Sequence, residues 1–158
     1  MPVDAGDLDL KSHLEICGKN ATYISKTSQN DLLECVKSFI QDKIVGEIQS
    51  QSAGPYFSIM ADEVTDTSNW EQLGIMVRYV KENTPVERLL CFENCERITG
   101  AALCDILVST LKDIGLDPVN CRAQCFDGAG NMAGVQNGCA AKFQKLAPRA
   151  PYFVLAMI

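Results

Sequence analysis

Histidine occurs only once in this chain of 158 residues, as His13. Zinc sites usually combine four cysteine or histidine ligands drawn from two closely spaced pairs. His13 and Cys17 are four residues apart and could share one face of a helix, but no second pair of that kind is evident. We therefore expect no zinc site in this protein.

The eight cysteines do not change that expectation. Two pairs with a spacing of four, Cys91/Cys95 and Cys121/Cys125, fall in predicted strands, where residues four apart are separated by about 13 Å. One zinc ion cannot bridge that distance. Since the chain shows no secretory signal, we expect reduced thiols and interpret most of the cysteines as small buried apolar residues.

Basic residues are also scarce. Lysine and arginine number 14 against 20 aspartates and glutamates, which gives a net charge of -6. A surface of that sign repels phosphate backbones, so the composition argues against a basic nucleic-acid-binding stripe. We expect contact with DNA only through other domains or an intervening metal ion, and we expect protein partners instead.

No apolar run approaches the length of a membrane span, and the N-terminal residues MPVDAGDLDL lack the basic-then-apolar order of a signal peptide. We expect no membrane association and a nuclear or cytoplasmic location. The length and the 47% hydrophobic content fit one domain with a sizeable core. We place it at residues 24–158, after a partly ordered segment at residues 1–23.

Hydrophobic periodicity predicts the order helix, strand, strand, strand, helix, strand, helix, strand. These elements are expected at residues 28–50, 56–61, 73–80, 86–92, 100–114, 121–126, 139–146 and 152–157. The first helix has too few heptads for a coiled coil, so we expect it to pack on a sheet, capped from Ser28. Strands two and three form a hairpin, while helical crossovers make the later strands parallel. The fold class is α/β, a mixed sheet with flanking helices.

Two of the predicted strands end in a carboxylate, Asp62 and Asp127. If strands one and four lie side by side and parallel, both residues reach the same edge of the sheet, where α/β proteins commonly build sites. Two close carboxylates need a counter-charge, and Mg²⁺ or Mn²⁺ would supply it. A metal-dependent nuclease would need a third ligand such as Glu63 or Asp66, but Glu63 points to the opposite side if the strand continues, and Asp66 fits a turn cap. In the alternative interpretation, each aspartate only forms a turn or caps a helix. We expect Gly128–Asn131 to be a flexible loop that passes close to Asp127.

Five segments carry a resemblance to a known family. They are YFSIMADEVTD, EQLGIMVRYV, VERLLCF, CFDGAGNMAGVQNG and LAPRAPYF. In this order they resemble hAT-type transposase-like proteins, more narrowly the zinc finger MYM-type protein 1-like proteins and relatives named for repressing the inhibitor of the protein kinase. The resemblance covers roughly residues 20–153 and implies a ribonuclease H-like fold with a DDE-type site. By motif, Asp62 matches the first acidic position and Asp127 the second.

In that family the third acidic residue, a glutamate, lies far downstream, and a zinc-finger DNA-binding domain precedes the core. This chain contains neither, so we expect a domain truncated at strand five and catalytically incomplete. It would be no enzyme by itself and would retain at most weak Mg²⁺ or Mn²⁺ binding at Asp62 and Asp127. The alternatives are a domesticated nuclear protein-interaction module and a metal-dependent nuclease with its own third ligand. An exposed sheet edge also permits self-association.

Overall fold

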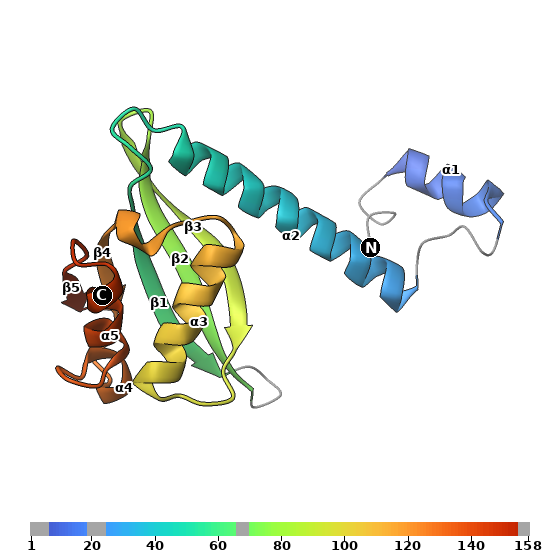
Figure 1. Cartoon of the computed structure of the whole chain (residues 1–158). Helices are drawn as coiled ribbons and strands as arrows, with labels where there is room; N and C mark the ends of the chain where they lie inside the picture. The colour runs from blue at the N-terminus through green and yellow to red at the C-terminus, as the bar shows by residue number, and fades with distance from the viewer. Residues whose placement is uncertain (1–6, 19–24, 66–69, 155–158) are drawn as a thin grey trace. The chain divides into compact units, whose positions relative to one another are not determined.

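The structure is a computed structural model that describes residues 7–18, 25–65 and 70–154. The chain divides into two compact units, Met1–Ile40 and Gln41–Ile158. Figure 1 labels their helices and strands. Predicted residues that fall outside the described ranges include Asp66 and the last residues of the expected fifth strand.

The first unit is helical. Helix α1 spans Leu8–Ile16, and the side chain of Asp7 caps it by accepting a hydrogen bond from the Leu10 N–H. Helix α2 spans Lys26–Gln49 and continues into the second unit. The Ser25 hydroxyl oxygen accepts a hydrogen bond from the Ser28 N–H at 3.1 Å, so α2 starts one turn before the predicted cap. No helix in the described ranges is long and apolar enough to cross a membrane.

Burial differs between the two ends of α2, and the predicted packing against the sheet is seen for the end that lies in the second unit. Only Ile44, Val45 and Ile48, near its end, are buried. Large apolar side chains of the first half are exposed: Leu32, Leu33, Val36, Phe39 and Ile40. Helical periodicity shows which face of a helix is apolar, but it does not show along how many turns another element covers that face.

The second unit contains a five-stranded sheet in the order β3-β2-β1-β4-β5. The strands are β1 Phe57–Thr65, β2 Glu71–Lys81, β3 Thr84–Asn94, β4 Cys121–Phe126 and β5 Tyr152–Val154. Strands β1, β2 and β3 pair antiparallel, whereas β4 pairs parallel with β1 and with β5. The predicted α/β class and the mixed sheet of hairpin plus parallel strands are confirmed.

The hairpin between β2 and β3 closes on two residues, Glu82 and Asn83, with φ of 50° and 62°. They lie between the paired residues Lys81 and Thr84. Two-residue hairpin loops with positive φ twist in the sense that the strands require, and asparagine tolerates this conformation well. Pro85 follows in β3, an edge strand, where a missing N–H is tolerated.

Helix α3, Gly100–Asp113, connects the hairpin to a short 3₁₀ helix, η2 at Pro118–Asn120, and to β4. Thr99 caps its start, and Gly115 with φ of 82° follows its end, as predicted. Helix α5, Cys139–Leu146, matches its predicted bounds. The prediction of a loop through Asn131 is wrong, because the short helix α4 begins at Gly130 and runs to Ala133.

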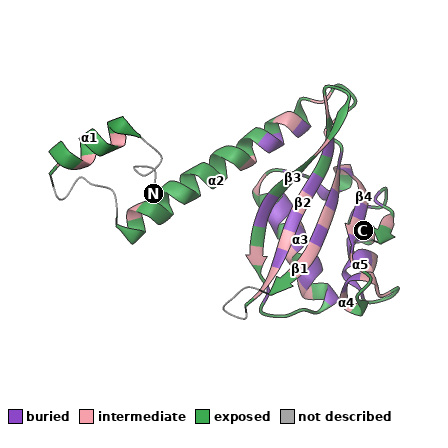
Figure 2. Cartoon of the chain, turned by 180° about the vertical axis from the view of Figure 1, so that it is seen from behind, coloured by how far each residue is buried: buried purple, intermediate pink, exposed green. Residues whose placement is uncertain are grey.

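Helix α3 lies over one face of the sheet (Figure 1), and the view from behind shows strands β1 to β3 in front of it (Figure 2). Alternation along the strands agrees with this arrangement. On β1, Phe57, Ile59 and Ala61 are buried, and residues between them are only partly buried. The buried set continues on β2 at Leu73, Ile75, Val77 and Tyr79. The core therefore lies between this face and the helices.

Close backbone approach, rather than a positive φ, explains Gly100. A Cβ at this position would lie 2.3 Å from the Asn137 carbonyl oxygen and 2.6 Å from the Asn131 carbonyl oxygen. Gly134 and Gly138 are similarly crowded by backbone atoms. By contrast, a Cβ at Gly128 or Gly130 would meet nothing within 4 Å, so close packing does not explain these two glycines.

We expect Gly100→Ala to lower the free energy of unfolding by about 1–3 kcal/mol, because overpacking forces the backbone of the α4–α5 segment to shift. Gly46→Ala is the matched control: Gly46 lies exposed in α2 with open space around its Cα, and alanine there should add roughly 0.5–1 kcal/mol of stability. Urea unfolding of both variants measures this difference, and similar effects in the two variants would contradict it.

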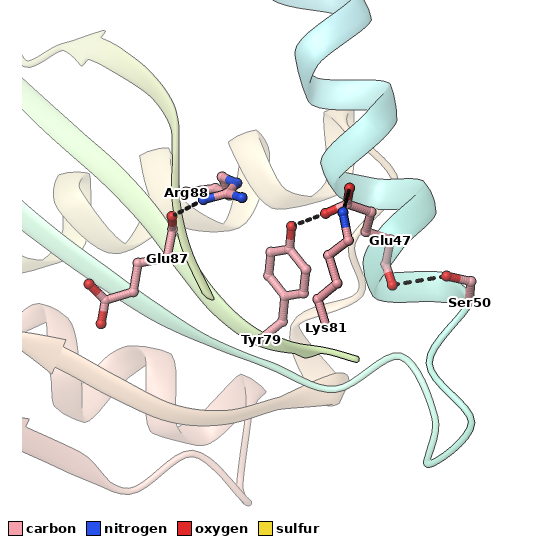
Figure 3. Close-up of polar contacts among 6 residues, drawn as sticks. All are labelled: Glu47, Ser50, Tyr79, Lys81, Glu87 and Arg88. Carbon is pink, nitrogen blue, oxygen red and sulfur yellow. Dashed lines mark hydrogen bonds and ion pairs between the residues drawn. The ribbon is translucent and has the colours of Figure 1, made fainter. Parts of the chain in front are cut away.

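Hydrogen bonds of Glu47 connect the last turn of α2 to β2 (Figure 3). The Tyr79 hydroxyl donates to Glu47 Oε2 at 2.5 Å, and Lys81 Nζ donates to Glu47 Oε1 at 2.7 Å. The hydrogen bond from Lys81, and then that from Tyr79, lowers the pKa of Glu47. Burial, and then Glu47, raises the pKa of Tyr79 to about 12.

A lowered carboxyl pKa stabilises the fold fully above the ordinary value of 4.5, and this contribution is lost as the pH falls through the lower folded value. We expect Glu47→Gln to reduce stability at pH 7 and to leave it nearly unchanged below the folded pKa of Glu47. Thermal unfolding at several pH values measures the effect. Glu82→Gln, a change on the exposed hairpin turn, is the control that should show no such pH dependence.

Candidate functional site at the end of strands β1 and β4

The pairing of β1 with β4 determines where Asp62 and Asp127 lie. Met60 pairs with Cys125 and Ala61 with Phe126, and the parallel ladder ends there. Asp62 and Asp127 are the next residue on each strand, so the fold brings the two predicted residues to the same edge of the sheet. Both side chains are partly buried.

Strand β1 does not end at its first carboxylate, as the sequence suggested. Its pairing with β2 continues through Asp62↔Gly74 and Glu63↔Leu73 to Thr65↔Glu71. The predicted end of the strand at Ala61 is therefore wrong for the pairing of β1 with β2. Polar residues can continue an antiparallel pair of strands, because their side chains can face solvent. Asp62 and Glu63 therefore lie inside a strand and point to opposite faces of the sheet.

Asp127 is held through its backbone rather than its side chain. Its carbonyl oxygen accepts a hydrogen bond from the Tyr152 hydroxyl at 2.9 Å, which links the end of β4 to β5. Its carboxylate oxygen Oδ1 is buried and has no hydrogen-bond partner among the residues that the structure describes. A buried carboxylate oxygen without a donor loses its hydration without compensation, so a bound cation or water would lower its free energy.

Glu63 occupies the helix-covered side, together with Asn131 from α4. Asn131 Nδ2 donates to Glu63 Oε1 at 2.6 Å and to the Ile98 carbonyl oxygen at 3.2 Å. Burial is the largest cause that raises the pKa of Glu63, and the charges of Asp127, Glu71 and Asp62 raise it further, while the Asn131 hydrogen bond opposes them. The carboxylates at this edge are thus close enough to repel one another.

Sequence reasoning did not identify Asn131 as part of this edge. The segment CFDGAGNMAGVQNG, which carries part of the resemblance, contains Asn131, but the sequence pattern predicts a loop there. The sequence did not reveal that α4 starts at Gly130. This helix places the side chain of Asn131 opposite Glu63.

The residues at this edge fit a hard cation better than zinc. The metal-binding groups of Asp62 and Asp127 are carboxylate oxygens, and one of these, Oδ1 of Asp127, has no hydrogen-bond partner among the described residues. Within residues 7–18, 25–65 and 70–154, however, no group of three or more histidine, cysteine, aspartate or glutamate side chains could hold a metal ion. Asp66 lies outside these ranges. The eight cysteines are all free thiols, and five of them are buried.

A model of the family DUF4371, described as the ZMYM1/FAM200, RNase-like domain, matches residues 8–138 of the chain. The chain belongs to this family. The resemblance to transposase-derived, zinc finger MYM-type 1-like proteins is therefore confirmed, and the RNase-like description agrees with the mixed five-stranded sheet.

Two curated relatives are named "52 kDa repressor of the inhibitor of the protein kinase", from Homo sapiens and Mus musculus. Each is 24% identical to this RNase-like domain over 151 residues, which cover 95% of the chain. The match takes up 19% of the human protein and 20% of the mouse protein. The chain thus spans about a fifth of the length of these relatives.

The raised pKa of Glu63 predicts whether its carboxylate stabilises or destabilises the fold. A carboxyl with a raised folded pKa destabilises the fold once the pH exceeds its ordinary value of 4.5. We expect Glu63→Gln to raise the melting temperature at pH 7 and to have little effect at pH 3.5, where both forms are neutral. Thermal unfolding at the two pH values measures this change, with Glu93→Gln as the control. A lower melting temperature at pH 7 would mean that the Glu63 carboxylate is net stabilising.

Proposed function

We propose that this transposase-derived, RNase-like domain binds a divalent cation weakly through Asp62 and Asp127 and does not cleave nucleic acid by itself. The observation that carries the proposal is the adjacency of the two residues beyond Ala61 and Phe126, combined with the unpartnered Oδ1 of Asp127. Mg²⁺ or Mn²⁺ is the cation that fits, because such ions accept one or two carboxylates and complete their shell with water or phosphate.

When bound, such an ion would polarise a phosphoryl oxygen and neutralise developing negative charge. The protein's own part is to hold two carboxylates at fixed strand ends, one of them anchored through the Asp127 carbonyl and Tyr152. Glu63 is a poor third ligand, because it faces away from Asp62 on the strand and its oxygen already accepts from Asn131. Two carboxylates without a third support binding but not the complete DDE-type chemistry.

Thermal unfolding with and without Mn²⁺ tests the metal site. Ligand that binds only the folded state at ten times its Kd adds about 1.4 kcal/mol of stability. We expect such a rise in melting temperature for the wild type, and we expect it to disappear in Asp62→Asn and in Asp127→Asn. Asp113→Asn removes an exposed carboxylate at the end of α3 and should keep the rise.

Two results would contradict the proposal in different ways. A rise that survives both site substitutions would place the metal elsewhere on this acidic chain. Mn²⁺-dependent cleavage of DNA or RNA that is lost in Asp127→Asn would mean that the domain is a nuclease with a third ligand of its own.

A second candidate is a protein-interaction module in the nucleus. It is supported by the printed name of the relatives, which describes an action on another protein, and by the net charge of -6, which disfavours direct DNA contact. Affinity capture with the wild type and with the Asp62→Ala/Asp127→Ala double variant separates the two candidates. Partners retained by the double variant favour the module, whereas partners lost with the carboxylates link binding to the metal site.

A further inference from the structure

A cleft of about 730 Å³ lies at the opposite end of the same strands, far from Asp62 and Asp127 along β1 and β4. It is formed by the last residues of α2, the starts of β1 and β4, and the β2–β3 hairpin turn. Its volume is within the range of roughly 300–1,000 Å³ that is usual for small-molecule sites. None of the residues assigned to the metal site lines this cleft.

Arg122, in β4, is presented to the cleft by an irregularity in the sheet. Phe57 pairs with Cys121, but the next residue of β1, Ser58, pairs with Ala123. Arg122 is therefore an extra residue on β4 with no partner on β1. Bulges of this kind re-aim a side chain and are frequent next to binding sites.

The guanidinium group of Arg122 is fixed in place before any ligand arrives. Its central carbon lies 3.8 Å from the centroid of the Tyr56 ring, and its Nη1 donates to the carbonyl oxygens of Val119 at 3.0 Å and Cys121 at 3.1 Å. A guanidinium held on an aromatic face loses little further freedom when it binds. No carboxylate in the part of the chain that the structure describes forms a salt bridge with Arg122.

Arg78 brings a second guanidinium to the same surface. Ser58 pairs with Arg78 on β2 and with Ala123 on β4, so the side chains of Arg78, Ser58 and Arg122 come from three adjacent strands. The ion pair of Arg78 with Glu87 is long, at 3.3 Å, and both side chains are about half exposed, at 53% and 48%. Such exposed pairs exchange partners at little cost.

Among the described residues, Arg122 is the cation of the cleft that no carboxylate pairs with, since Arg78 pairs with Glu87 and Lys81 with Glu47. Lys81 and Glu47 neutralise each other through their 2.7 Å ion pair, and Glu82 lies exposed on the hairpin turn. Three basic and two acidic residues line the cleft, whereas the whole chain has a net charge of -6. The charge of Arg122, which no ion pair of the described residues neutralises, attracts anions.

We propose that this cleft binds a small organic anion, whose carboxylate or phosphate oxygens are held by Arg122 and Arg78 with the Ser58 hydroxyl between them. Guanidinium groups bind both kinds of oxyanion through paired N–H donors. The remaining volume accommodates a body larger than an inorganic ion, which the ring of Tyr56 and the side chain of Val80 would contact.

Nuclear magnetic resonance of the ¹⁵N-labelled full chain tests the proposal, with the arginine Nε–H signals as the readout. Succinate and phosphoserine are the two probes, and they distinguish a carboxylate from a phosphate site. We expect at least one of them to shift the Arg122 signal saturably at millimolar concentration, and more strongly than sodium chloride of equal ionic strength. Equal shifts with chloride would show ionic screening only and would overturn the proposal.

Three variants sharpen the test. In the variants the Arg78 Nε–H signal is the readout: Arg122→Gln should abolish saturable binding, and Arg97→Gln, the same change in charge on an exposed loop residue after β3, should retain it. Arg122→Lys keeps the charge but loses the paired donors, so we expect about tenfold weaker binding, and it also decides the matter if Arg122→Gln fails to fold. Full affinity in Arg122→Lys would mean that the guanidinium is not the ligand-binding group and would overturn the proposal.

Discussion

The parallel hydrogen bonds between β1 and β4 join residues 57–61 to residues 121–126, and the rest of the second unit is arranged around them. This ladder fixes the register in which Ala61 meets Phe126, and so it places Asp62 and Asp127 beside each other. At the other end, the shift between Phe57 and Ser58 in the same ladder frees Arg122 from pairing. Both candidate sites thus depend on one strand pair, and a change in its register would disrupt both.

The edge of the sheet with Asp62, Glu63 and Asp127 is destabilised by desolvation and by repulsion between carboxylates, and the fold offsets this only in part. Desolvation and three neighbouring carboxylates raise the pKa of Glu63, while a single amide, Asn131, opposes them. That amide also binds the Ile98 carbonyl oxygen, so it connects β1 to the segment before α3. The close approach at Gly100 is part of this arrangement, since Asn131 and Asn137 carbonyl oxygens lie against it. The edge is therefore supported by backbone packing rather than by counter-charges of its own.

Much of this architecture follows from local sequence signals. Thr99 and Gly115 mark both ends of α3, and the strand Cys121–Phe126 has the predicted bounds. The adjacency of Asp62 and Asp127 follows from helical crossovers, which force parallel pairing. Asn131 and Arg122 could not be found in this way. The role of each depends on a contact with residues distant in sequence, Glu63 in one case and the β1 register in the other.

The two ends of the sheet differ in charge because of strand direction. Parallel strands β1 and β4 carry carboxylates after their last paired residues, whereas Arg122 follows the first residue of β4 and Arg78 lies opposite the start of β1. A cation bound at one end would compensate the carboxylates there, and an anion bound at the other end would compensate the guanidinium groups. The two ligands would use different residues. In an acidic chain that disfavours phosphate backbones, the end with Arg122 and Arg78 is the part of the sheet suited to an anionic ligand. Under the two proposals, the same unit would bind ligands of opposite charge, and both sites would require the β1–β4 register.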